Sequence, residues 1–331
     1  MEKIRKILIG ILYTVAVLVA LFSILSIFRN TPSRYLKMLD FPRIQFFITS
    51  LICLVILIVL TKHRKWYNYV MMSLLLLGLL INGNYLYSYT PFSSVTVPNS
   101  PPSINTDKVI SILLVNVKMK NRNSKKLLEQ IETKNPDVIL AMEVDRWWDK
   151  QLSKIEKKYP YHREVINDVA YGMALYSKYS FENITVDNLN NDKIPYIEGL
   201  LRVKNNRLVT FHCVHPVPPT HYKDLPDNEG NEEKAMKMLG FRVEEANYPS
   251  IVIGDFNDVV WSKVDELTHT DNLLFDVRTG RGFYNSYNAE SFIMRWPLDH
   301  IYVTKEFSLK KIERLDYMGS DHYPMYVELT L

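Results

Sequence analysis

The sequence predicts a protein of two parts: an all-α membrane segment of three helices, followed by an α/β domain whose sheets are covered by helices on their outer faces. Three observations support this prediction. Three long apolar runs fall within the first 89 residues. From residue 108 onward, short strand-like apolar stretches alternate with helical ones. This second part has roughly 230 residues, which can bury one sizeable core.

The first apolar run, Ile7–Phe28, follows the basic residues Lys3, Arg5 and Lys6. Its 22 uncharged residues suffice to cross a hydrocarbon core of about 30 Å at about 1.5 Å per residue. A cleaved signal peptide is the alternative. The run is long for one, no small-x-small cleavage site follows it, and two more apolar runs come after it. We therefore expect a retained membrane span.

The second and third spans are expected at Ile44–Leu60 and Tyr69–Tyr89. Asn82 and Asn84, near the end of the third run, are expected at the membrane interface or in hydrogen bonds between helices. Three tyrosines there are typical of an interfacial aromatic belt: Tyr85, Tyr87 and Tyr89.

The distribution of basic residues predicts the orientation of the spans. If the N-terminus lies inside, the cytoplasmic flanks hold Lys3, Arg5, Lys6, Lys62, Arg64 and Lys65. The opposite loop then holds Arg29, Arg34, Lys37 and Arg43. Because the larger basic set stays in the cytoplasm, this orientation is favoured. Three spans then place everything after Tyr89 outside the cytoplasm.

Charge also bears on the substrate. Residues 1–101 carry 10 Lys/Arg and 2 Asp/Glu, whereas residues 102–331 carry 30 Lys/Arg and 34 Asp/Glu. The second part is therefore slightly acidic, and polyanion-binding proteins usually show a clustered basic surface. The two cysteines, Cys53 in an apolar run and Cys213 in a strand, lie in settings too different for a disulfide to be expected.

The domain boundaries follow from composition. Residues 1–89 form the three-helix transmembrane region, and residues 90–107 form a Pro/Ser-rich extended linker. Residues 108–331 form the second domain. Its expected strands are Val109–Val117, Asp137–Val144, Gly172–Ser177, Gly199–Val203, Leu208–Val214, Ile251–Ile253, His300–Val303 and Tyr323–Leu329. Its expected helices are Ser124–Thr133, with Ser124 as N-cap, and Asn228–Asn247.

The stretch around Asp255 carries the clearest chemical signal. Ile251–Ile253 predicts a buried strand, and Gly254 ends it. Asp255 and Asn257 follow two residues apart, so both project to one side of the backbone. Such oxygen ligands suit a divalent cation and a phosphate. The alternative is an ordinary Asx-rich turn.

Similar polar residues stand at the ends of the other expected strands. They are Asn116, Glu143, His215, the pair Asp299–His300 and the pair Asp321–His322. Each alone suits a turn, a cap or a structural histidine. Five such strand ends in one domain are hard to explain as turns, so the pattern predicts metal-assisted hydrolysis of a phosphate ester.

With these motifs, the second domain resembles the endonuclease/exonuclease/phosphatase superfamily, which includes pancreatic deoxyribonuclease, abasic-site endonucleases, neutral sphingomyelinases and inositol-polyphosphate phosphatases. The matching motifs are Asn116, Glu143-Val144, His215, Gly254-Asp255-Phe256-Asn257, Leu298-Asp299-His300-Ile301 and Ser320-Asp321-His322-Tyr323-Pro324. The resemblance implies a four-layer α-β-β-α sandwich with the site at one rim of two packed sheets. Met142 departs from the family, where many members carry Gln. The three-span N-terminus resembles that of bacterial membrane-anchored members.

Mg²⁺ or Mn²⁺ is the expected cofactor, because hard cations prefer oxygen ligands. Glu143 and Asn116 are expected to bind it, and Asp321 to complete its coordination. Asp255 and Asn257 are expected to position the nucleophile and the phosphorus, or to hold a second metal.

Three further residues are expected to handle protons. Asp299 would orient His322 and make it a better general base toward water. His215 would donate a hydrogen bond to a phosphoryl oxygen or assist the leaving group. The remaining histidines are expected to be structural: His212, His221, His269 and His300.

Three functions remain open at this stage. A membrane-tethered phosphodiesterase or phosphatase acting on a lipid-linked phosphate or pyrophosphate is favoured, because tethering to the bilayer raises the effective concentration of lipid substrates. An envelope nuclease is the second, since a local basic cluster could touch phosphates: Lys118, Lys120, Arg122, Lys125 and Lys126. A catalytically silent membrane scaffold is the third, and the complete residue set argues against it.

Overall fold

The computed structural model describes residues 2–29, 33–60, 65–103, 106–189, 192–218, 232–262, 268 and 270–331. Contacts divide the chain into two compact units, Met1–Ser93 and Ser94–Leu331. We describe each unit by itself.

The first unit consists of helices. α1 (Glu2–Leu25), α3 (Arg43–Leu60) and α4 (Trp66–Tyr87) are each long and apolar enough to cross a membrane. The short α2 (Arg34–Lys37) lies between the first two. The predicted spans therefore exist as helices, and the boundaries of the first and third lie two to five residues earlier than expected.

A buried polar cluster ties these helices together. The Asp40 carboxylate bonds the guanidinium groups of Arg29, at 2.8 Å, and of Arg43, at 2.5 Å. Arg43 also donates to Ser26 Oγ at 3.1 Å and to Asn82 Oδ1 at 3.3 Å. Asn82 Nδ2 in turn donates to Ser23 Oγ at 3.0 Å. The expected helix–helix hydrogen bonding of Asn82 is thus present.

The three tyrosines expected in an aromatic belt have different environments. The Tyr85 ring lies 3.7 Å from the Arg43 guanidinium, Tyr89 is buried, and Tyr87 is exposed. Tyr85 and Tyr89 therefore also take part in packing within the protein.

Residues 96–100, expected as part of a linker, are attached to the second unit. Leu309 N–H donates to Pro98 O at 2.8 Å, and Ser100 N–H donates back to Leu309 O at 2.9 Å. Val97 is buried in the core, and Arg281 donates to its carbonyl oxygen at 2.6 Å. The segment is extended, as its composition predicts, but it is paired along strand β11 (Ser308–Arg314).

The second unit contains two six-stranded mixed sheets. The first has the strand order β11-β12-β1-β2-β4-β3 and the second the order β5-β6-β7-β8-β10-β9. The strands of the first sheet are β1 (Val109–Asn116), β2 (Val138–Met142), β3 (Tyr161–Val165), β4 (Met173–Ser177), β11 and β12 (Met325–Thr330). Those of the second are β5 (Phe181–Asp187), β6 (Tyr196–Arg202), β7 (Leu208–Val214), β8 (Ser250–Asp255), β9 (Phe275–Asp276) and β10 (Asp299–Val303).

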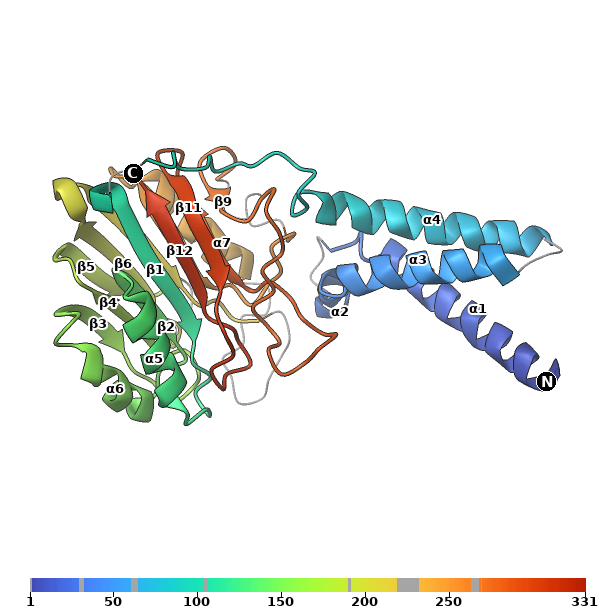
Figure 1. The fold of residues 1–331 in the computed structure, drawn as a ribbon, viewed down its shortest axis with the longest axis horizontal. Helices are drawn as coiled ribbons and strands as arrows, with labels where there is room; N and C mark the ends of the chain where they lie inside the picture. The colour runs from blue at the N-terminus through green and yellow to red at the C-terminus, as the bar shows by residue number, and fades with distance from the viewer. Residues whose placement is uncertain are drawn as a thin grey trace. The chain divides into compact units, whose positions relative to one another are not determined.

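Alternation along the strands sorts side chains into layers. Ile112 and Leu114 of β1 join the core between the sheets, whereas Leu113 and Val115 face outward to α5 (Ser124–Lys134) and α6 (Arg146–Leu152). On the other side, α7 (Glu232–Glu244) covers the outer face of the second sheet. Figure 1 shows these helices against their sheets. The predicted four-layer α-β-β-α sandwich is confirmed.

The strands that the sequence did not predict share one property. β3, β5, β9 and β11 are the outermost strands of the two sheets, and β3, β5 and β11 carry partly exposed, polar side chains. Edge strands lack a continuous apolar pattern, so periodicity does not reveal them. α6 was also missed.

The starts of two predicted helices differ from the prediction or lie outside the described residues. The assignment of Ser124 as N-cap was wrong: Asn123 precedes the helix, Ser124 is its first residue, and the Ser124 hydroxyl donates to Gln151. The expected start of the second helix, residues 228–231, lies outside the described residues, as do His221, His269, Lys62 and Arg64.

Candidate active site

The strand topology brings the predicted residues to one edge of the sandwich. β1 and β2 run parallel and end at Asn116 and Met142, so Glu143 follows directly. β7 and β8 also run parallel, and β10 pairs antiparallel with β8 so that Asp299 lies opposite Asp255. Strand ends from both sheets therefore supply the site.

Gly254 is required by the close approach of two parallel strands. A Cβ added there would lie 1.8 Å from Val214 O, which is an impossible contact. The glycine therefore lets β8 run tightly beside β7 and fixes the position of Asp255, the next residue.

The first group of site residues surrounds Asn116. Its Nδ2 donates to Glu143 Oε1 at 2.9 Å and to Asp255 Oδ2 at 3.0 Å. The Met119 N–H donates to the other Glu143 oxygen at 3.0 Å. Asp321 Oδ2 lies 3.4 Å from Lys118 Nζ. Four oxygen-bearing side chains thus lie together, and one of them, Asp321, pairs with the cationic Lys118.

The second group is the predicted dyad. His322 Nδ1 lies 2.7 Å from Asp299 Oδ2. Ser286 Oγ accepts the Asp299 N–H at 3.1 Å, and Arg278 donates to Asp299 O at 3.1 Å. The His322 N–H donates to Ser320 Oγ at 3.1 Å. Both members of the dyad are therefore held by their own backbone contacts.

Asp255 joins the two groups. Its Oδ2 lies 3.4 Å from His322 Nε2 and 3.8 Å from His215 Nε2, while its Oδ1 accepts the Asn257 N–H at 2.8 Å. Asn257 Nδ2 donates to Pro216 O at 2.9 Å. The Asx turn considered as an alternative is thus present: it holds the backbone of Asn257, while the bond to Pro216 O holds its side chain.

The electrostatics of the site are perturbed by burial. Burial lowers the pKa of His322, but Asp299 and Asp255 outweigh it and raise the pKa to about 10. Burial raises the pKa of Asp255 and of Glu143, and it lowers the pKa of His215. Opposite shifts among neighbouring buried groups are typical of catalytic sites.

Two left-handed backbone conformations and two unpaired buried atoms occur at this site. Glu143 and Asn257 have φ of 60° and 52°, in the left-handed region that non-glycine residues rarely adopt. His215 Nδ1 and Asp299 Oδ1 are buried without a hydrogen-bond partner among the described residues. Buried polar atoms are normally paired, so these two are poised for a ligand or water.

All eight predicted site residues therefore belong to one contact network. They are Asn116, Glu143, His215, Asp255, Asn257, Asp299, Asp321 and His322. His300 and His212 do not join it. His300 bonds Tyr302 and Asp258 O, and His212 bonds Tyr196.

Sequence reasoning missed several residues that support the site. Met142, noted only as a departure from the family, accepts the Asp255 N–H through its sulfur at 3.1 Å. Tyr287 places its ring 4.9 Å from that of His322. Asp299 is contacted directly by Ser286 and Arg278, and Asp321 is contacted by Lys118. Only Ser320, inside a recognised motif, carried a sequence signal.

The donor set fits a divalent cation. Glu143 and Asp321 are close enough for Asp321 to raise the pKa of Glu143, so positive charge between them would stabilise both. A group of three potential ligand atoms also lies within 4.8 Å at Asp255, Asp299 and His322. Carboxylate and amide oxygens suit Mg²⁺ or Mn²⁺.

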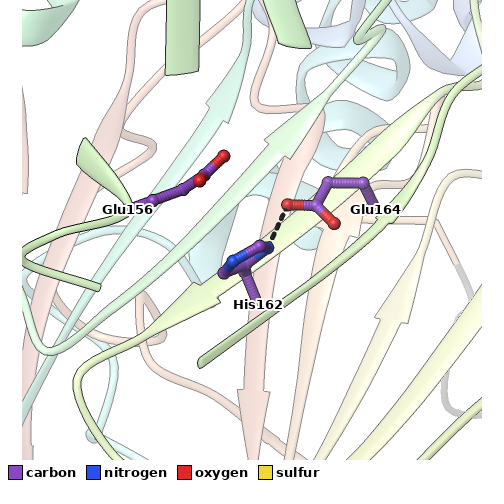
Figure 2. A group of neighbouring side chains, drawn as sticks. All are labelled: Glu156, His162 and Glu164. Atoms are coloured by element: carbon purple, nitrogen blue, oxygen red, sulfur yellow. Dashed lines mark hydrogen bonds and ion pairs between the residues drawn. The ribbon is translucent and has the colours of Figure 1, made fainter. Parts of the chain in front are cut away.

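A second group of potential ligands lies away from this site. Glu156, His162 and Glu164 gather beside edge strand β3, and His162 bonds Glu164 (Figure 2). In the strand order, β4 separates β3 from β2, which leads to Glu143. All three side chains are partly exposed, so we give this group no part in the reaction.

Comparisons with known proteins agree with this geometry. A model of the Endonuclease/Exonuclease/phosphatase family matches residues 113–322. D. rerio TDP2 complexed with single strand DNA product is 16% identical, with a TM-score of 0.56, covering 67% of this chain and 99% of that one. A family protein from Bacteroides thetaiotaomicron is 18% identical, with a TM-score of 0.51, covering 67% and 98%.

The human Nocturnin catalytic domain with bound sulfate is 16% identical, with a TM-score of 0.50, covering 69% of this chain and 96% of that one. At these identities the likeness establishes the fold. No curated protein matches the chain.

Proposed function

Because this chain belongs to the endonuclease/exonuclease/phosphatase family, we propose that it is a membrane-anchored, divalent-metal-dependent phosphoesterase acting on a lipid-linked phosphate ester or pyrophosphate. Phosphoester hydrolysis follows from the family. The metal, the lipid substrate and the outer face of the cytoplasmic membrane are our proposals. The observation that supports them best is the single network of eight polar residues on a chain with three membrane-spanning candidates.

Each residue of the network has a task in this proposal. Glu143, Asn116 and Asp321 would hold Mg²⁺ or Mn²⁺, which neutralises charge on the phosphoryl oxygens. Asn257, fixed by its two hydrogen bonds, positions the phosphate. His215, whose pKa is lowered by burial, is a neutral hydrogen-bond donor to a phosphoryl or leaving-group oxygen.

The base is best assigned to a pair rather than to His322 alone. With a pKa near 10, His322 carries a proton at neutral pH when its carboxylate neighbours are charged. Asp255 lies 3.4 Å from its Nε2, and the two titrate together. We therefore assign acceptance of the water proton to Asp255 and His322 as a pair, with Asp299 holding the imidazolium in place.

Charge favours a lipid headgroup over nucleic acid. The second domain carries 34 acidic and 30 basic residues from residue 102 onward, so it lacks the basic excess typical of polyanion binders. The envelope nuclease stays the alternative, supported by the basic residues that follow β1 and by the TDP2 complex with DNA as a structural neighbour.

One assay panel decides between these functions. Purified full-length protein in detergent is given a lipid phosphate, a soluble phosphate ester and single-stranded DNA, each with Mg²⁺, Mn²⁺ or EDTA. We expect release of phosphate from the lipid, abolished by EDTA. Cleavage of DNA that weakens steeply with salt would instead establish the nuclease.

The orientation is tested separately. The positive-inside count places the C-terminus outside the cytoplasm, so a C-terminal reporter active only in the cytoplasm should stay silent. An active reporter would reverse the orientation and bring cytosolic substrates back into consideration.

A further inference from the structure

Three consecutive apolar side chains are exposed on the catalytic unit. Phe292 is 90% exposed, Ile293 71% and Met294 45%. We call Phe292–Met294 the apolar tip. The other exposed large apolar side chains described in this unit each stand alone in sequence: Val95, Tyr161, Phe241, Tyr248 and Tyr317. A contiguous apolar surface of this kind usually marks an interaction site.

The loop that carries the apolar tip is fastened to the active site. Its two sides pair through Tyr287 and Trp296, which exchange backbone hydrogen bonds. Ala289 N–H donates to Asp321 O at 2.7 Å. Tyr287 also forms a backbone bridge to His322. The tip is therefore an extension of the rim of the active site, held by residues next to the reacting centre.

Basic side chains surround the base of the tip. The Arg295 guanidinium lies 5.9 Å from the Phe292 ring and 5.4 Å from the Tyr323 ring, and Arg314 lies 4.4 Å from the latter. Lys118, by contrast, pairs with Glu290 at 3.2 Å and with Asp321 at 3.4 Å, so the basic charge at the base of the tip comes from Arg295 and Arg314. Apolar side chains that project beyond basic and aromatic ones match a bilayer, whose acyl chains lie beneath anionic headgroups.

The chain's own membrane segment keeps a bilayer within reach. α4 ends at Tyr87, and the chain is attached to the catalytic unit from Thr96, which donates to Asp276 O at 3.2 Å. The eight residues between them span at most about 30 Å when fully extended. When α4 spans a bilayer, that bilayer therefore stays close to the catalytic unit.

We propose that the apolar tip inserts into the surface of the membrane and holds the active site against a lipid phosphate. The proposal rests on the proposed function and goes further, because it names the residues that select a membrane-borne substrate. Phe292 and Ile293 would enter the boundary between headgroups and acyl chains, while Arg295 and Arg314 remain among the headgroup phosphates. The substrate phosphate would then approach Asn116 and His322 without leaving the bilayer.

Insertion is measured directly with a fluorophore. Ile293→Cys in the full-length chain is labelled with an environment-sensitive maleimide; the native Cys53 and Cys213 are 4% and 0% exposed, so they resist labelling. The control is Phe241→Cys, an exposed position on α7. In vesicles of phosphatidylcholine and phosphatidylglycerol, we expect a blue-shifted emission at residue 293, quenched by brominated lipid. Equal emission and equal quenching at the two positions would overturn the proposal.

A kinetic measurement separates this inference from the proposed function. Phe292→Ser combined with Ile293→Ser should leave hydrolysis of soluble p-nitrophenyl phosphate unchanged. With phosphatidic acid in phosphatidylcholine vesicles, the half-saturating surface concentration should rise about tenfold, and Phe241→Ser should have no effect. If wild type and the double variant hydrolyse the lipid equally, the insertion proposal fails. If the wild type hydrolyses only the soluble ester, the lipid-linked substrate of the proposed function is wrong. The fluorescence measurement then still decides whether the tip inserts into the membrane.

Discussion

Two clusters of buried charge lie in the two units of this chain, and they are built differently. In the membrane unit, Asp40 bonds Arg29 and Arg43, and Arg43 continues to Ser26 and Asn82. Each of the charged side chains in this cluster is hydrogen-bonded, and Asn82 uses both its amide oxygen and its amide nitrogen. At the sheet edge, by contrast, His215 Nδ1 and Asp299 Oδ1 are buried without a partner among the described residues.

Backbone conformation differs in the same way. At the active site, Glu143 and Asn257 adopt left-handed conformations, whereas among the described residues every one with a positive φ lies outside the membrane unit. A structural cluster completes its hydrogen bonds in a relaxed backbone, because unpaired buried groups are costly. A reactive cluster keeps unpaired atoms and strain, which the surrounding fold must compensate. The comparison thus separates a cluster whose polar groups are paired from one that keeps buried polar atoms available.

The largest expected effect comes from breaking the dyad. His322→Ala and Asp299→Asn should each lower kcat by about 10²- to 10⁴-fold, because proton transfer and charge stabilisation are lost together. The double variant should be little worse than the poorer single one, since the residues act as one unit. Steady-state kinetics on the soluble ester measure this.

His300→Asn is the matched control for the dyad. His300 neighbours Asp299 in sequence, but its ring bonds Tyr302 and Asp258 O on the other face of the strand. Its loss should reduce stability and spare kcat in the folded fraction. The dyad assignment is wrong if His300→Asn abolishes turnover and His322→Ala does not.

Breaking the membrane cluster should change stability instead of catalysis. Asp40→Ala leaves two buried guanidinium groups without their carboxylate, which costs about 3–5 kcal/mol of unfolding free energy. Thermal unfolding in detergent reports it, with Glu2→Ala as control, because the Glu2–Lys6 pair is exposed and contributes almost nothing. A loss of kcat with unchanged stability would make this cluster functional.

Neutralising Glu143 should weaken metal binding. Glu143→Gln keeps the shape but removes the charge, and it replaces one of the two oxygens that accept from Asn116 and from the Met119 N–H with an NH₂ group that cannot accept. We expect a loss of Mg²⁺ affinity of about 10- to 100-fold or more, because altering even an outer-shell partner of a metal typically costs that much. A high Mg²⁺ concentration should restore activity only in part. Titrating the rate with Mg²⁺ measures this.

Asp145→Asn is the control for Glu143. Asp145 caps α6 through the Trp148 N–H and pairs with Arg122, so it should affect folding but not metal dependence. An identical Mg²⁺ titration for Glu143→Gln and wild type would remove Glu143 from the metal site.

The smallest expected effect is at Asn82. Asn82→Ala removes the hydrogen bonds of Asn82 to Ser23 and Arg43. It should lower the unfolding free energy by about 0.6 kcal/mol, the average for hydrogen bonds between membrane helices. Turnover should be unchanged. A loss of unfolding free energy as large as that of Asp40→Ala would mean that the Asn82 amide stabilises the cluster as much as its charged groups do.

The inner strands and the site could be predicted because their patterns are local. β1, β2, β7 and β8 are mostly apolar and almost entirely buried. A polar residue stands at the end of each strand or directly after it, and the fold brings all four to one edge: Asn116, Glu143, His215 and Asp255. The edge strands could not be predicted, because β3 and β11 carry Arg, Lys and Glu on their exposed faces.

Supporting residues escaped prediction for a different reason. Ser286 and Arg278 contact Asp299 but precede it in sequence by 13 and 21 residues, so no local motif marks them. Lys118 was noticed only as part of a basic cluster. That it faces Asp321, about two hundred residues later in the chain, depends on the neighbouring positions of β1 and β12.

The pairing of residues 96–100 with β11 decides how a soluble enzyme should be cut from this chain. A fragment starting at Lys108, where composition places the domain boundary, would lose Val97 from the core and uncover the outer edge of β11. Uncovered edges associate with one another, so such a fragment should aggregate. A fragment starting at Ser94 retains the covering segment and is the better choice for expression and crystallisation.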